Sequence, residues 1–140
     1  MGMVIFSQIA LNCKDQSVTE AFYTKYFGFR RVRVITLPDK EIIFLKMLDC
    51  SIYLELFKAT EESPLPPAEQ DGYVFPAVVR QLGFKVDDVA AKLKEIEAGG
   101  DLQINLGPLN FSDFIPDWIT VWIRDPDGAI VELSQNFVDE

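Results

Sequence analysis

Residues 121–135 read VWIRDPDGAIVELSQ, two apolar stretches that flank the tetrapeptide DPDG at 125–128. Pro126 presets the backbone of a tight turn, and Gly128 tolerates the positive φ that such turns require. Both flanking stretches are rich in β-branched and aromatic residues, which favour strands. The segment therefore predicts a β-hairpin near the end of the chain, with strands at 118–124 and 129–135.

A carboxylate interrupts an apolar run in two of the predicted strands. Glu132 lies in the second strand of the hairpin, and Glu55 lies between two leucines in residues 51–57, SIYLELF. Side chains alternate between the two faces of a strand, so each glutamate lies opposite the apolar side chains that flank it. We interpret the two glutamates as facing one shared site from the two halves of a duplicated fold.

Short internal similarities support the duplication. The segment QIALNCKD begins at Gln8 and matches QLGFKVDD, which begins 73 positions later at Gln81. The segment YLELF contains Glu55 and matches IVELS, which contains Glu132, 77 positions later. Two matching blocks in the same order at nearly the same offset indicate an internal repeat.

The pattern along the chain predicts the order βαβββ, linker, βαβββ, which is an α+β fold. The first helix is expected from a cap at Asp15 or Ser17 to about Phe27, and the second over 87–100. The predicted strands are 4–13, 29–37, 41–48, 51–58, 80–86, about 101–106, 118–124 and 129–135. Residues 107–117 are expected to form a loop. Module one therefore spans about 4–58, a Pro-rich acidic linker spans 59–79, and module two spans about 80–137.

Composition excludes several classes of function. The chain has 140 residues, a formal net charge of −9 and a pI near 4.5, which opposes binding to nucleic acid and to anionic membranes. No apolar run is long enough for a membrane-spanning helix, and the start lacks a signal-peptide pattern, so a cytoplasmic location is expected. The absence of histidine excludes Ser-His-Asp and Cys-His catalysis and every His-based metal site.

The strand face that carries the glutamates also carries amides and aromatic rings. By alternation Gln8 and Gln81 share it with Glu55 and Glu132, a combination typical of a pocket lining. The aromatic residues expected to line a ligand pocket are Phe44, Phe57, Phe111, Trp118 and Trp122. For any single ring, a role in the core or in a dimer contact is the alternative.

Three segments resemble the vicinal oxygen chelate superfamily, the glyoxalase, bleomycin-resistance and extradiol-dioxygenase group. They are NCKDQSVTEAFYTKYFGFRRV, LGFKVDDVAAKLKEIEAGG and the closing hairpin VWIRDPDGAIVELSQ. The resemblance covers nearly the whole chain. It implies paired βαβββ modules forming a U-shaped mixed sheet around a cavity, a small-molecule ligand or substrate, and a homodimer.

The resemblance also implies a metal site formed by Gln8, Glu55, Gln81 and Glu132. Many metal-dependent members have histidine at the two glutamine positions, so this set offers only oxygen ligands. Such a set suits Mg²⁺ or Mn²⁺ better than Zn²⁺, Ni²⁺ or iron.

Two functions stay open at this point. One is a metal-dependent lyase or isomerase of the glyoxalase type, acting on a carbonyl or thioester-type substrate, with Glu132 or Glu55 as the catalytic base. The other is a metal-free protein that binds or sequesters a ligand, as bleomycin-resistance proteins do, using its aromatic residues as a platform.

Overall fold

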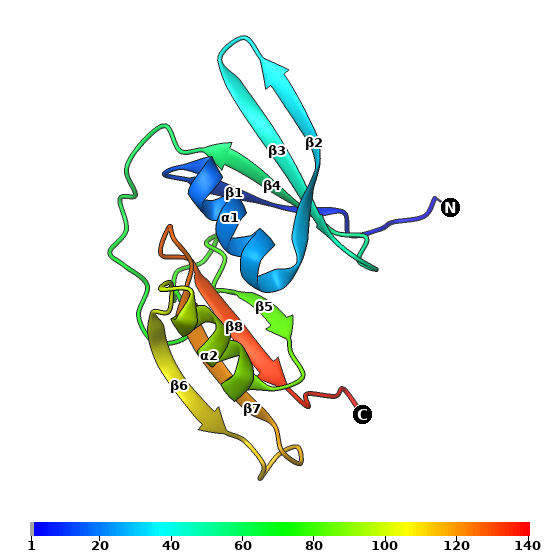
Figure 1. Cartoon of the computed structure of the whole chain (residues 1–140), viewed down its shortest axis with the longest axis vertical. Helices are drawn as coiled ribbons and strands as arrows, with labels where there is room; N and C mark the ends of the chain where they lie inside the picture. The colour runs from blue at the N-terminus through cyan, green and yellow to red at the C-terminus, as the bar shows by residue number, and fades with distance from the viewer. Residues whose placement is uncertain (1) are drawn as a thin grey trace. The chain divides into compact units, whose positions relative to one another are not determined.

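A computed structural model describes residues 2–140, and the chain divides into two units, residues 1–64 and 65–140. Each unit contains one βαβββ module, drawn in blue to green and in green to red in Figure 1. The α+β class and the repeated order of elements expected from the sequence are confirmed.

Module one consists of β1 (Gln8–Cys13), α1 (Gln16–Phe27), β2 (Phe29–Leu37), β3 (Lys40–Met47) and β4 (Tyr53–Lys58). Its four strands form a sheet in the order β1-β4-β3-β2, with β1 parallel to β4 and the other neighbours antiparallel. The helix packs against one face of this sheet, which leaves the opposite face for other contacts (Figure 1).

Module two repeats the arrangement with β5 (Leu82–Lys85), α2 (Val89–Ala98), β6 (Ile104–Asn110), β7 (Ile119–Arg124) and β8 (Ile130–Gln135). The strand order is β5-β8-β7-β6, with β5 parallel to β8. Corresponding strands therefore occupy corresponding places in the two sheets, as a duplication requires.

The apolar strand face is buried where alternation predicted it. Leu54 and Leu56 in β4, and Val131 and Leu133 in β8, are all buried. Burying a side chain of this size contributes about 1.5–3 kcal/mol relative to leaving it exposed. The helix-facing sides of the two sheets are therefore the cores of the modules, and Glu55 and Glu132 lie on the other sides.

The two largest differences from the expected element boundaries are at the start of β1 and at the end of β6. The first strand begins at Gln8 rather than residue 4, because its partner β4 begins at Tyr53, whose N–H donates to the Ser7 carbonyl. Residues 4–6 are exposed. Strand β6 extends to Asn110, into the predicted loop, because an irregularity between Leu106 and Leu109 accommodates a proline that cannot donate a hydrogen bond.

No helix among residues 2–140 is long and apolar enough to span a membrane.

Candidate ligand-binding site in the second module

Glu132 lies in the middle of the sheet of module two, between two register partners. Gly83 of β5 lies on one side and Trp122 of β7 on the other. A Cβ atom built on Gly83 would contact the Glu132 carboxylate at 3.8 Å, so the absence of a side chain there leaves open space beside the carboxylate. The carboxylate is half-buried at the edge of this space.

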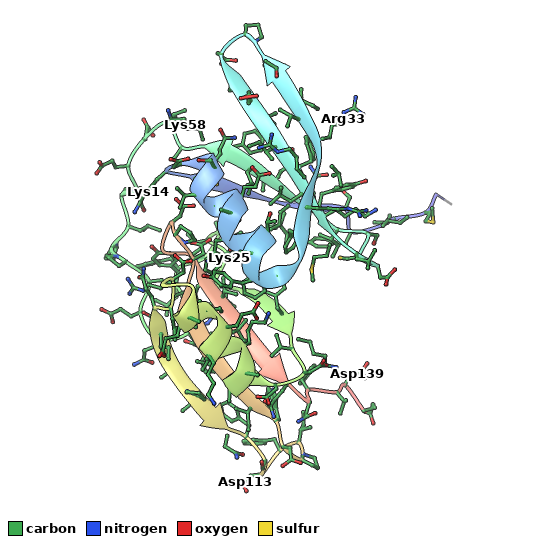
Figure 2. All side chains as sticks on the ribbon, viewed as in Figure 1. Lys14, Lys25, Arg33, Lys58, Asp113 and Asp139 are labelled. Carbon is green, nitrogen blue, oxygen red and sulfur yellow. The ribbon has the colours of Figure 1, made fainter. Side chains whose placement is uncertain are left out.

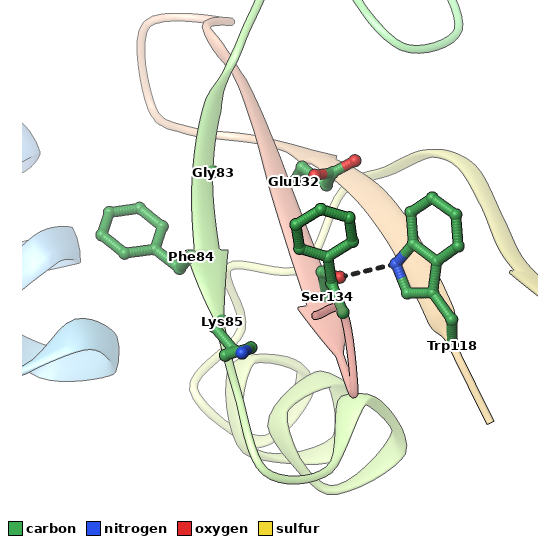
Figure 3. A pocket seen from close by; sticks show the side chains of 7 residues that line it. Gly83, Phe84, Lys85, Trp118, Glu132 and Ser134 are labelled. Atoms are coloured by element: carbon green, nitrogen blue, oxygen red, sulfur yellow. Dashed lines mark hydrogen bonds between the residues drawn. The ribbon is translucent and has the colours of Figure 1, made fainter. Parts of the chain in front are cut away.

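A cavity of about 230 Å³ opens beside Glu132. Its lining consists of Gly83, Phe84, Lys85, Trp118, Glu132, Ser134 and Phe137. Figure 3 shows the Trp118 indole directed toward Ser134, to which its Nε1 donates a hydrogen bond of 3.0 Å. This bond fixes the orientation of the indole, so one wall of the cavity is a flat ring held in place.

Further aromatic rings extend this wall. The Trp118 ring lies 5.0 Å from Phe111 and 5.4 Å from Phe137, measured between centroids. Phe114 contacts Phe111 at 6.4 Å and is 77% exposed. A cluster of rings that remains partly exposed beside a polar group is typical of a binding surface for an apolar ligand.

Burial raises the pKa of Glu132, because removal of water disfavours the ionised carboxylate. The negative charge of Asp71 raises it further. The Thr120 hydroxyl has the opposite influence, although its Oγ1 makes no hydrogen bond within the usual limits to any described group. Glu132 therefore holds a proton more readily than an exposed glutamate does.

Three buried polar atoms of module two lack a hydrogen-bond partner among residues 2–140: Gln81 Oε1, Thr120 Oγ1 and Trp122 Nε1. Leaving such an atom unsatisfied costs roughly 1–3 kcal/mol. By strand alternation all three residues belong to the sheet face that carries Glu132. This face therefore keeps unused hydrogen-bonding capacity next to its one carboxylate.

The linker folds back onto this same face as a strap, which we define as residues 65–80. Arg124 fastens it, with Nη2 donating to the Ala68 carbonyl at 2.9 Å and Nε donating to Asn105 Oδ1 at 2.8 Å. Asn105 in turn donates to the Gln70 carbonyl at 2.8 Å. The side chain of Arg124 therefore holds the strap against the sheet.

The strap separates the two tryptophans that the sequence placed in one pocket. Trp122 is only 7% exposed and packs with Ala68 and Ile130, and Tyr73 of the strap lies against the same cluster. Trp118 lies toward the other end of β7 and lines the cavity. Phe111 contacts both the Trp122 cluster and Trp118 but does not line the cavity.

Module one brings together the residues that alternation assigned to its open face. Gln8 Nε2 donates to Glu55 Oε2 at 2.6 Å, and Glu55 is 8% exposed. Phe44 is the register partner of Glu55, and Phe57 follows two positions later on the same side of β4. The amide of Gln8 therefore meets the carboxylate through its N–H, while its oxygen accepts from the Ser7 hydroxyl at 2.7 Å.

The two modules differ in how readily their glutamine and glutamate oxygens could bind a metal ion. In module two the unpartnered Gln81 Oε1 and the desolvated Glu132 are oxygen donors that a hard divalent cation would suit. In module one the Gln8 amide would have to turn over to present its oxygen beside Glu55. Among residues 2–140 no group of three or more His, Cys, Asp or Glu side chains forms a metal cluster.

Several residues that line the cavity or influence Glu132 were not singled out from the sequence. Thr120 and Ser134 follow from the alternation that placed Trp122 and Glu132, and Lys85 follows from Gly83 in the same way. Phe137 lies beyond the end of β8, and Asp71 lies in the strap, so no strand period reaches either residue.

The model of the Glyoxalase/Bleomycin resistance protein/Dioxygenase superfamily matches residues 5–133, and the chain belongs to this superfamily. A glyoxalase family protein from Enterococcus faecalis is 25% identical, with 93% of this chain and 96% of that chain covered and a TM-score of 0.68. Lactoylglutathione lyase from Agrobacterium tumefaciens is 25% identical, with 96% of each chain covered and a TM-score of 0.59.

TnmS3, an antibiotic binding protein from Streptomyces sp. CB03234, is 19% identical with a TM-score of 0.68, covering 98% of this chain and 99% of that chain, and shares the fold. No curated protein matches the chain.

Proposed function

We propose that this protein binds a small organic molecule with a flat apolar body in the cavity of module two, and that Glu132 recognises a hydrogen-bond donor or cationic group on it. The observation that supports this proposal is the half-buried carboxylate at the edge of a cavity walled by aromatic rings. A desolvated carboxylate gains most from a partner that brings a proton or a positive charge.

The walls and the charge of the chain define the ligand further. The orientation of Trp118 is fixed by Ser134, so a planar ligand can stack on its ring without ordering it first. The net charge of −9 favours the approach of cations, although Lys85 contributes one positive charge to the lining. A planar aromatic cation fits these features best.

Tryptophan fluorescence tests the proposal, with the planar cationic dye proflavine as the probe. Proflavine is expected to quench the emission saturably, and Glu132→Gln is expected to weaken binding by about tenfold, the usual loss when a charged hydrogen-bond partner is removed. Trp118→Phe should abolish most of the quenching. Trp122→Phe is the matched control, because Trp122 lies under the strap and does not line the cavity.

A metal chelator should leave this titration unchanged. Absence of saturable quenching by proflavine and also by the anionic dye anilinonaphthalene sulfonate would contradict ligand binding in the cavity. Equal effects of the two tryptophan substitutions would place the ligand elsewhere.

The unpartnered Gln81 Oε1 favours a second function, a metal-dependent lyase or isomerase acting on a carbonyl or thioester-type molecule. The family resemblance assigns Gln8, Glu55, Gln81 and Glu132 to the metal, and oxygen ligands suit Mg²⁺ or Mn²⁺. A bound divalent ion would polarise a substrate carbonyl. Glu132 or Glu55 would act as the base that moves a proton on the substrate, and the likeness to a lactoylglutathione lyase supports this class.

Elemental analysis separates the two functions. The protein is stripped with chelator, incubated with a mixture of divalent metals and desalted, beside the variant Glu55→Ala/Glu132→Ala. About one retained equivalent that the variant loses supports the metal-dependent function. No retained metal in either protein supports the metal-free one.

The resemblance also leads us to propose a homodimer and a cytoplasmic location. Sedimentation velocity at micromolar concentration tests the first, and a dimer mass near twice 15.9 kDa is expected.

A further inference from the structure

Module one contains a second hollow, of about 400 Å³, to which neither proposed function assigns a role. It lies where β2 begins, β3 ends and residues 48–52 lead into β4, and it is lined by Arg30, Lys46 and residues 47–51. Its lining includes three charged residues, Arg30, Lys46 and Asp49, whereas the cavity beside Glu132 is lined by three aromatic rings.

Two positive charges face each other at this hollow. Arg30 and Lys46 are register partners across the antiparallel pair β2–β3, so their side chains leave the same face of the sheet. Like charges directly opposite each other destabilise a sheet. Neither side chain makes an ion pair with any residue that the structure describes, although the chain has 22 acidic residues and only 13 basic ones.

Protection of an exposed sheet edge does not explain this pair. Charged residues often prevent edge strands from aggregating, and that role suits Arg30 on the edge strand β2. Lys46 lies on the inner strand β3, and its ammonium group is held over the Tyr53 ring at 5.4 Å from the centroid. The inner position and this cation–π contact orient the second charge beside the first.

The hollow offers further hydrogen-bond donors. The Ser51 hydroxyl is a further donor in the lining, in addition to the guanidinium of Arg30 and the ammonium of Lys46. Asp49 is the one carboxylate in the lining. We propose that this hollow binds the oxyanion group, carboxylate or phosphate, of a small molecule, with Arg30 and Lys46 as its charged partners. The oxyanion would give the two cations the ion-pair partner that neither has among the residues that the structure describes.

Titration with inorganic phosphate and, separately, with acetate tests the site in the full chain. Backbone amide resonances of residues 46–51 are followed by NMR at constant ionic strength maintained with sodium chloride. Saturable shifts confined to the hollow are expected for at least one anion. Comparison of phosphate with acetate tells whether the hollow binds a phosphate or a carboxylate group more tightly. Arg30→Gln and Lys46→Gln should each weaken binding about tenfold.

Two matched variants distinguish a site from general attraction. Arg33→Gln removes the same charge from the same strand, but Arg33 does not line the hollow, and Figure 2 shows its side chain directed away from the strand. It should leave binding unchanged. Asp49→Asn should tighten binding several-fold, and asparagine tolerates the positive φ of 58° at this position.

Cys50 provides an independent reporter inside the hollow. It is partly exposed, whereas Cys13 is buried, so alkylation of the native protein reports on Cys50. Negatively charged iodoacetate should react faster relative to neutral iodoacetamide than it does with a free thiol, and Arg30→Gln/Lys46→Gln should remove this preference. Phosphate or acetate should slow the reaction.

The proposal is overturned if no anion saturates, if Arg33→Gln weakens binding as much as Arg30→Gln, or if iodoacetate shows no preference. The proposed anion site lies in module one, whereas proflavine is expected to bind beside Glu132 in module two. Proflavine binding should therefore persist in the Arg30 and Lys46 variants. Failure of this site is thereby distinguishable from failure of the proposed function.

Discussion

Glu55 and Glu132 occupy equivalent positions of the repeat but have different surroundings. Glu55 accepts a hydrogen bond of 2.6 Å from the amide of Gln8, in a register that places Gln8 two positions before the glutamate's own partner. Gln81 has the same relation to Glu132, yet its Oε1 is unpartnered. Glu55 is therefore part of a satisfied pair, whereas Glu132 adjoins open space and unused polar groups.

This difference predicts opposite effects on stability when each glutamate is replaced by glutamine. The pKa of Glu132 is raised in the folded state, so its contribution to stability is full below its unfolded pKa and is lost as pH rises through its folded pKa. Glu132→Gln should therefore raise the Tm at pH 7.5 by a few degrees, and the gain should shrink toward zero at pH 4.

Thermal unfolding of Glu132→Gln and wild type across this pH range measures the effect. Glu55→Gln is the control and should lower the Tm at pH 7.5, since it weakens a bond to a charged acceptor by about 1 kcal/mol. A lower Tm for Glu132→Gln at neutral pH would contradict the argument.

Strand alternation predicted which face each of these residues occupies, because the period of two is a property of the backbone. It placed Gln8 with Glu55 and Trp118 opposite the core. It could not predict that Trp122 is buried, because the cover comes from Ala68 and Tyr73 in the strap, at distant positions in the sequence.

At the scale of single elements, the N-terminus of helix α2 is capped by an aspartate side chain. Two aspartates, Asp87 and Asp88, precede the helix, and the side chain of an aspartate can cap a helix from either position in the sequence. The structure assigns the cap to Asp88, whose Oδ1 accepts from the Ala91 N–H at 3.0 Å. Only one residue can occupy the cap position, where the backbone is extended while the helix begins.

Replacement of the two aspartates should therefore have unequal consequences. Asp88→Ala is expected to lower the free energy of unfolding by about 1 kcal/mol, because it leaves a helical N–H unsatisfied. Asp87→Ala removes the same charge from the preceding position and should change stability by less than about 0.5 kcal/mol. Urea unfolding of both variants measures the difference, and equal losses would show that charge rather than capping is responsible.

The side chain of Arg124 is central to holding the strap in place. Arg124 donates to the strap at Ala68 and to Asn105, which itself holds Gln70. Arg124→Gln should cost roughly 1–3 kcal/mol and make Trp122 more accessible to acrylamide. Arg80→Gln breaks the half-exposed pair with Asp71 and a longer bond of 3.3 Å to the Tyr73 carbonyl, so it should cost at most about 1 kcal/mol and leave Trp122 protected.

Quenching of Trp122 by acrylamide, in a Trp118→Phe background, measures the opening of the strap. Unchanged protection in Arg124→Gln would show that the packing of Ala68 against the indole is sufficient without the arginine. The composition of residues 59–79 predicted an irregular connection, but these carbonyl contacts have no periodic signal. The course of the strap was therefore not predictable from the sequence.

At the scale of the whole molecule, the repeated element order was predictable because both modules use the same local signals. Capping aspartates, glycine-terminated helices and alternating strands occur in the same order in both halves. Phe137, beyond the end of β8, completes the lining of the cavity beside Glu132, and Phe111 packs behind its Trp118 wall; no repeat specifies either residue. A duplicated scaffold thus differs between its halves mainly where loops complete it.

The net charge of −9 is the property that acts on the whole molecule at once. At neutral pH the carboxylates repel one another more in the compact state than in the unfolded chain, and salt screens this repulsion as the Debye length falls from about 30 Å at 0.01 M to about 10 Å at 0.1 M. The Tm at pH 7.5 should therefore rise by a few degrees between 10 and 300 mM sodium chloride. Near the pI of about 4.5 the repulsion vanishes, so the same salt series should leave the Tm nearly constant.

Thermal unfolding at both pH values measures the effect, and Arg33→Gln, which adds one unit of negative charge, should steepen the salt dependence at pH 7.5. A Tm that falls with salt at pH 7.5 would mean that attractive ion pairs, such as Arg31 with Glu20, outweigh the excess of negative charge.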